Sequence, residues 1–142
     1  MSPSKKRVGR SLKPFQRPLL WSSLWMLAVA VVVIGSLMPA QDLPNVPRGF
    51  DKLEHFGAYA LLAAGAVQLF VRRLSWGFVC VILVLMGIGL EYLQAQMGLG
   101  RMLDRQDALA NTIGVLIGLA TAFTPWRDAL LRIDRRLASR AG

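Results

Sequence analysis

Residues 26–34 read Met26-Leu27-Ala28-Val29-Ala30-Val31-Val32-Val33-Ile34, an unbroken apolar stretch within the 24 uncharged positions 18–41. A helix of a soluble bundle needs a polar stripe along its exposed side, whereas this stretch is apolar on every side. At about 1.5 Å per residue, a helix of this length covers the roughly 30 Å hydrocarbon core of a bilayer. The stretch therefore predicts a membrane-spanning helix.

Three more segments of the 142-residue chain lack charged residues, namely 55–71, 74–90 and 108–126. The chain is 54% hydrophobic, too apolar for an ordinary soluble domain. We predict an all-α membrane bundle of four transmembrane helices near 19–38, 54–71, 76–95 and 108–124. The single cysteine, Cys80, excludes an internal disulfide and is expected to be a small apolar residue.

The basic residues predict the orientation of the bundle. Thirteen of the 17 Lys and Arg lie before the first span, between spans two and three, or after span four, and the other four lie in 39–53 and 95–107. Because basic residues are retained on the cytoplasmic side, both termini should be cytoplasmic. Most acidic residues lie near the opposite, outer side: Asp42, Asp51, Glu54, Glu91, Asp104 and Asp107.

We divide the chain into a basic cytoplasmic segment, 1–18, a four-helix membrane domain, 19–124, and a basic tail, 125–142. The tail has apolar residues at helical spacing between arginines, as in a short amphipathic helix on the inner leaflet. Segment 1–18 fits an uncleaved anchor better than a signal peptide, because the apolar stretch after it is too long for one. The retention of basic residues on the cytoplasmic side and their attraction to anionic lipid headgroups explain the charge of this segment. We therefore expect no nucleic-acid partner. The Pro-rich segment 39–49 should be an external loop.

Polar residues form one stripe on each of spans two, three and four, at their outer ends. The stripes hold Asp51, His55 and Tyr59; then Gly87, Glu91 and Gln94; then Asp104, Asp107, Asn111, Gly114 and Gly118. Ionisable groups in a bilayer face the bundle interior, water or a partner, so the stripes should point at each other. In span four, Ala110, Gly114, Gly118 and Ala122 also form a small-residue seam, which favours close packing inside the bundle over dimerisation.

Three of these residues are candidates for catalysis: His55, Glu91 and Asp107. His55 and Glu91 would suit acid–base chemistry, but the cluster has no serine nucleophile. With one histidine and no HExxH or cysteine cluster, the sequence has no zinc signature, so we expect no metal and no cofactor, although carboxylates could hold a hard cation. A purely structural pairing of Glu91 with His55 or Arg101 is the alternative.

The order Asp51-Lys52-x-x-His55-Phe56-x-x-Tyr59, then Glu91-x-x-Gln94, then Arg101-x-x-Asp104-x-x-Asp107-x-x-x-Asn111-x-x-Gly114-x-x-x-Gly118 resembles the pattern of the VanZ-like membrane proteins. These are small multi-pass bacterial proteins, and their namesake is linked to low-level teicoplanin resistance. The resemblance covers about residues 51–118 and implies a bacterial inner-membrane location.

We therefore expect a polar pocket on the extracytoplasmic side that recognises a cell-envelope component, such as an envelope lipid or a lipid-linked glycan precursor. A membrane-embedded enzyme and a structural accessory subunit are the alternatives. The partners would be membrane lipids, and the sequence leaves the oligomeric state open. The expected ligand-binding residues are Asp51, Lys52, His55, Tyr59, Glu91, Gln94, Arg101, Asp104, Asp107 and Asn111.

Overall fold

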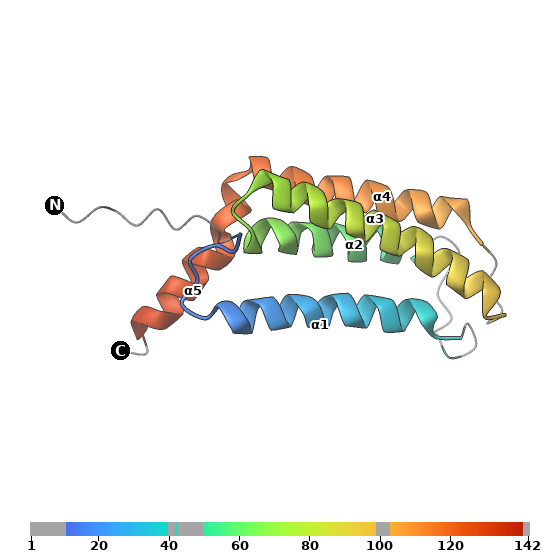
Figure 1. The fold of residues 1–142 in the computed structure, drawn as a ribbon, viewed down its shortest axis with the longest axis horizontal. Helices are drawn as coiled ribbons and strands as arrows, with labels where there is room; N and C mark the ends of the chain where they lie inside the picture. Colours follow the sequence, from blue (N-terminus) through green and yellow to red (C-terminus); the bar gives the residue numbers. More distant parts are fainter. Residues whose placement is uncertain (1–10, 40–41, 43–49, 99–102, 141–142) are drawn as a thin grey trace.

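The computed structural model describes residues 11–39, 42, 50–98 and 103–140, and this part of the chain is helical, with no strand. Four long helices lie side by side, and a fifth packs across one end (Figure 1). Their bounds are α1 Pro18–Leu37, α2 Phe50–Leu69, α3 Arg73–Gln96, α4 Arg105–Ala120 and α5 Ala129–Arg140, with 3₁₀ turns at Thr121–Phe123 and Pro125–Asp128. The prediction of an all-α fold is confirmed. Arg48, Gly100, Arg101, residues 1–10 and most of the Pro-rich segment lie outside the described residues.

Three helical segments are long and apolar enough to cross a membrane, namely Pro18–Leu37, Arg73–Gln96 and Arg105–Phe123. The predicted second span, which corresponds to α2, is not among them. Its first turns carry Asp51, Lys52, Glu54 and His55, which lower the hydropathy of the whole helix. Since α2 contacts each of the other three long helices, it is sheltered from the surroundings and needs fewer apolar side chains than its neighbours.

The helix ends follow from local sequence. Pro18 stands in the first turn of α1, where its missing N–H costs no hydrogen bond. Asp104 caps α4 by accepting a hydrogen bond from the Gln106 N–H at 2.7 Å. The α2–α3 connection, 70–72, is short, so the two helices form an antiparallel hairpin.

Helix α4 packs most extensively on α2, along the predicted small-residue seam. A Cβ added to Gly118 would overlap the Ala60 carbonyl oxygen and lie 2.7 Å from the Ala63 Cβ. A Cβ at Gly114 would overlap the Phe56 carbonyl oxygen in the same way. The prediction that the seam serves packing inside the bundle is confirmed, because the two backbones touch where the side chains are missing.

The core lies between α2, α3 and α4, and its buried members are Tyr59, Leu62, Ala63, Cys80, Leu83 and Val115. Large apolar side chains on the outer faces are exposed, among them Leu61, Phe78, Leu85 and Leu116. Apolar groups of this size on the outside of a bundle suit a lipid environment. Cys80 is buried among apolar residues, as expected.

Helix α1 is held by a few polar contacts and contributes no buried residue. In its middle, the Trp25 indole donates to the Leu62 carbonyl at 2.9 Å, and its ring fills the space above Gly65. Near its start, the Trp21 indole donates to Asp134 of α5 at 2.8 Å. At its other end, the Gln94 amide donates to the Ser36 carbonyl. The apolar face of α1 is thus left largely uncovered.

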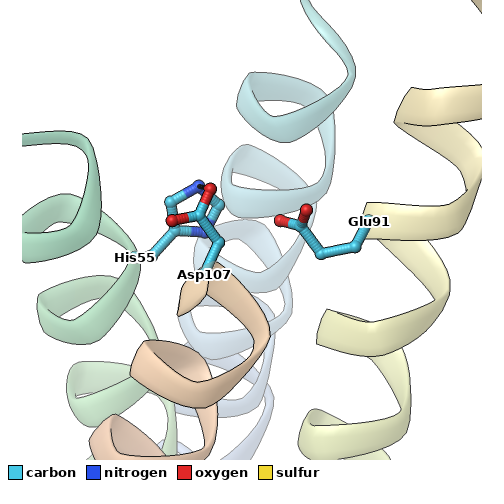
Figure 2. A group of neighbouring side chains, drawn as sticks. All are labelled: His55, Glu91 and Asp107. Atoms are coloured by element: carbon cyan, nitrogen blue, oxygen red, sulfur yellow. Dashed lines mark ion pairs between the residues drawn. The ribbon is translucent and has the colours of Figure 1, made fainter. Parts of the chain in front are cut away.

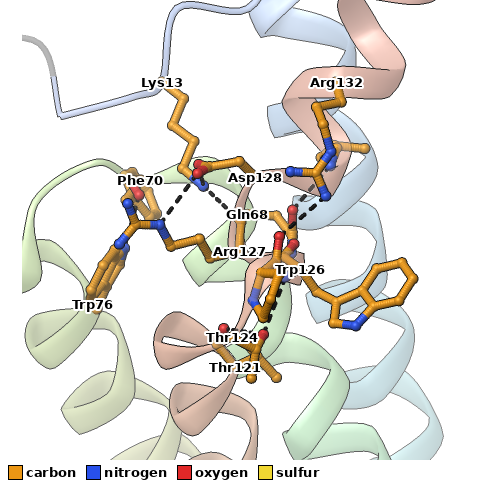
Figure 3. A network of polar contacts seen from close by, with 12 residues as sticks. Lys13, Gln68, Phe70, Trp76, Thr121, Thr124, Trp126, Arg127, Asp128 and Arg132 are labelled. Carbon is orange, nitrogen blue, oxygen red and sulfur yellow. Dashed lines mark hydrogen bonds and ion pairs between the residues drawn. The ribbon is translucent and has the colours of Figure 1, made fainter.

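The α2–α3 connection, the 3₁₀ turns, α5 and the segment before α1 all meet at one end of the bundle, called here the turn end (Figure 1). Lys13 is buried and ties them together, since its backbone N–H donates to the Leu69 carbonyl and its ammonium lies 2.9 Å from Asp128. Figure 3 shows the surrounding network, in which Gln68 bridges the Trp126 carbonyl and the Leu130 N–H. The predicted tail helix is present as α5, and these contacts fix it to the bundle.

Candidate functional site

The three polar stripes meet at the end of the bundle opposite the turn end. Helices α2 and α4 begin there and α3 ends there, because α3 runs antiparallel to both. This geometry brings the first turns of α2 and α4 beside the last turns of α3. We call the cluster of His55, Glu91, Asp107, Asn111 and Lys52 the polar site.

His55, Glu91 and Asp107 form the centre of the polar site, one from each helix. Figure 2 shows the three side chains pointing toward one another from α2, α3 and α4. Each offers an imidazole nitrogen or a carboxylate oxygen, and these atoms all lie within 4.8 Å of one another. Glu91 is 4% exposed, and the side chains of His55 and Asp107 are 12% and 14% exposed. The centre is therefore largely screened from solvent.

The His55 ring is oriented by Asn111, whose amide oxygen lies 3.1 Å from the His55 Nδ1. Because an amide oxygen only accepts, Nδ1 carries the proton in this hydrogen bond. The other ring nitrogen, Nε2, faces the Asp107 Oδ2 at 3.9 Å, beyond hydrogen-bond distance. Asn111 is itself held against α3 and is 2% exposed. A Cβ at Gly87 would lie 3.0 Å from the Asn111 amide nitrogen, so Gly87 makes room for this side chain.

Lys52 closes the polar site on its exposed side. Its ammonium donates to the Asp104 Oδ2 at 2.8 Å and to the Asp107 Oδ1 at 3.1 Å. Hydrogen bonds from Lys52 and from the Gln106 N–H, with the Lys52 charge, hold the pKa of the Asp104 carboxyl below its ordinary value. Glu91 accepts a longer hydrogen bond, 3.4 Å, from the Asp104 N–H. The start of α4 is thus joined to both α2 and α3.

The remaining predicted site residues behave differently. Tyr59 is buried in the core beside Gly87, one helical turn below His55. Gln94 is buried but turns toward α1, where it donates to the Ser36 carbonyl instead of joining Asp107. The Asp51 Oδ1 is buried and has no hydrogen-bond partner among the described residues. Arg101 lies outside the described residues, so its predicted place in the site stays a prediction.

Two pockets flank the polar site. One, of about 190 Å³, lies between α1 and α2 and is lined by Val31, Val32, Gly35, Ser36, Glu54, His55, Ala58 and Tyr59. The other, of about 210 Å³, lies between α3 and α4, where Glu91 and Asp104 stand among Ile88, Leu103 and Ala108. Both pockets combine apolar walls with a polar group of the site. The first is called here the α1–α2 pocket.

Two features of the site were not predicted. Ser36 gives α1 a polar position on the α1–α2 pocket, but it is a small residue near the end of an apolar helix and has no neighbours that mark it in the sequence. Lys52 was expected to bind the ligand, and the structure shows it pairing two carboxylates. The i, i+3 spacing of Asp104 and Asp107 predicts two carboxylates on one helix face, but it does not show that Lys52 is the cation that pairs with them.

Chemically, the polar site can exchange a proton at the His55 Nε2, bind a cation between His55 and the carboxylates, or donate hydrogen bonds to an anionic group through Lys52. The described residues offer it no cysteine, since Cys80 is in the core. Comparisons with protein-family models, curated proteins and solved structures found no match to this chain. Function is therefore inferred from the site itself.

Proposed function

We propose that this chain is a multi-pass protein of the bacterial inner membrane, of the VanZ-like kind, and that its polar site binds the headgroup of an envelope lipid on the extracytoplasmic side. In this proposal α2 also crosses the membrane, as the second of four spans, and both termini are cytoplasmic. The apolar helices, the basic residues at the turn end and the order of the polar motifs support it.

The observation that carries the proposal is the lining of the α1–α2 pocket. Val31, Val32 and Ala58 line it with apolar groups, and Glu54, His55 and Tyr59 add polar ones. This combination suits an amphipathic molecule. At about 190 Å³ the pocket is smaller than the roughly 300–1,000 Å³ of sites that enclose a whole ligand. It therefore fits a headgroup whose acyl chains stay in the bilayer.

Lipid retention tests this proposal. The full chain, purified in a mild detergent, should carry a bound lipid that native mass spectrometry detects. Val32→Trp should remove the lipid by filling the pocket without changing a polar residue. Leu27→Trp is the matched control, because Leu27 is 59% exposed and does not line the pocket. Equal lipid retention by both variants, or no lipid on the wild-type protein, would contradict the proposal.

An enzyme is the second candidate, favoured by the His55 orientation. Asn111 fixes one ring nitrogen and leaves the other facing Asp107, as in an acid–base pair. If the protein is an enzyme, the purified protein should convert the lipid that native mass spectrometry identifies into a product. Product formation that is lost in His55→Gln but kept in Val33→Ala would support the enzyme. A lipid that is bound and released unchanged would exclude it for that ligand.

A further inference from the structure

The arrangement of His55, Glu91 and Asp107 matches the requirements of a metal ion. A divalent cation binds imidazole nitrogen and carboxylate oxygen at about 2.0–2.3 Å, so two ligand atoms on opposite sides of one ion lie roughly 4.4 Å apart. The three ligand atoms here lie within 4.8 Å of one another and come from three helices (Figure 2). Small side-chain rotations are enough to place all three on one ion.

The hydrogen bond to Asn111 is independent support. Histidines that bind metals usually donate their other ring N–H to an oxygen, which fixes the tautomer and aims the free nitrogen at the ion. The His55 Nδ1 meets the Asn111 amide oxygen at 3.1 Å, and Nε2 faces the Asp107 Oδ2. The separation of Nε2 and Oδ2, 3.9 Å, is close to that of two ligand atoms on one ion.

The charges in the polar site also favour a bound cation. Lys52 pairs with the carboxylates of Asp104 and Asp107, and it takes the Asp107 Oδ1, leaving Oδ2 toward His55. One ammonium group thus meets two carboxylates. In a largely buried site a surplus of negative charge is costly, and a divalent cation would offset it.

We propose that the His55 Nε2 and one carboxylate oxygen each from Glu91 and Asp107 bind one divalent metal ion, with Asn111 orienting the imidazole. One imidazole and two carboxylates suit ions such as Mn²⁺ or Zn²⁺. Three protein ligands leave coordination positions open for water or for an oxygen of a bound ligand. The proposal goes beyond headgroup binding and does not depend on it. It departs from the expectation of no metal, which rested on the absence of a zinc motif and not on the distances between these three side chains.

The chain has one histidine, which makes the test specific. Full-length protein labelled with ¹⁵N-histidine, and purified without a polyhistidine tag, gives imidazole NMR signals from His55 alone. One equivalent of Zn²⁺ should shift the Nε2 signal and leave Nδ1 protonated, and Mn²⁺ should broaden it. Asp107→Asn, which is close to isosteric, should weaken Zn²⁺ affinity by roughly tenfold or more.

Asp42→Asn is the matched control, because Asp42 is an exposed carboxylate that belongs to neither the triad nor the α1–α2 pocket. It should keep the wild-type affinity and the same NMR shift. Thermal melts of each variant in detergent establish that the proteins are folded. The proposal is overturned if the His55 signals of folded wild-type protein do not change with millimolar Zn²⁺ and Mn²⁺, or if Asp107→Asn binds Zn²⁺ as tightly as Asp42→Asn.

Discussion

Asp134 is fully buried at the turn end and joins α5 to the start of α1. Its carboxylate accepts hydrogen bonds from the Trp21 indole at 2.8 Å and from the Gln16 N–H at 2.5 Å. In the sequence it is one acid among the arginines of the tail, where a solvated ion pair would be the ordinary expectation. A buried carboxylate that accepts two such bonds is instead a structural tie.

Removal of this tie should destabilise the protein. Asp134→Ala removes the acceptor of two part-buried donors, each bond worth about 0.5–1.5 kcal/mol, so we expect a loss of about 1–3 kcal/mol. Asp134→Asn should cost less, because it keeps one acceptor. Ser139→Ala, an exposed position on the same helix, should be neutral. Chemical denaturation in detergent measures the three variants, and wild-type stability of Asp134→Ala would show that the tie is not needed.

The same residue predicts a response to acid. Burial raises the pKa of Asp134, but hydrogen bonds from Trp21 and from the backbone of Gln16 and Arg17, with the Arg17 charge, outweigh it and lower the pKa below 3.8. A lowered pKa means that the folded state binds the proton more weakly than the unfolded state does. This stability is therefore complete well above pH 4 and is lost as the pH falls through the folded-state pKa. Melting temperatures between pH 3 and pH 6 should fall less steeply in Asp134→Asn than in the wild-type protein.

The packing of α4 on α2 requires glycine at a defined position, and alanine tests it. Gly118→Ala would press a Cβ against the Ala60 carbonyl and the Ala64 nitrogen, which are backbone atoms that cannot rotate away. We expect a cost of about 1–3 kcal/mol as the helices separate. Gly89→Ala is the matched control, because open space surrounds Gly89 and alanine favours a helix by about 0.5–1 kcal/mol. Thermal melts that place both variants on the same side of the wild-type value would refute the close approach.

Some of these features could be predicted from the sequence, and others could not. The seam was predictable because small residues every four positions mark a helix face that another backbone can approach. The convergence of His55, Glu91 and Asp107 was predictable from helical periodicity and from the cost of charge in lipid. Two contacts could not be predicted, namely that of Gln94 with Ser36 and that of Trp21 with Asp134. Each joins residues 58 or more positions apart through one side chain, which leaves no periodic trace.

The polar site lies at one end of the bundle, and a group of basic residues lies at the other. Lys13, Arg73 and Arg127 line a common pocket at the turn end, so the segments on either side of the bundle share that end with the α2–α3 connection. Because basic residues are retained in the cytoplasm, we expect the turn end to lie on that side and the polar site on the other. The 20 residues of α2 span roughly 30 Å, enough to reach from one side to the other although its hydropathy is low.

Alkaline phosphatase fusions decide this orientation, because the reporter is active only outside the cytoplasm. A fusion after Arg73 or Arg140 should be inactive, and one after Gly98 should be active. The fusion after Arg73 is the decisive one, since it reports whether α2 crosses the membrane. Activity there would put the α2–α3 connection outside. Because α2 and α3 pack side by side, the polar site would then face the cytoplasm, and an extracytoplasmic headgroup could not be its ligand.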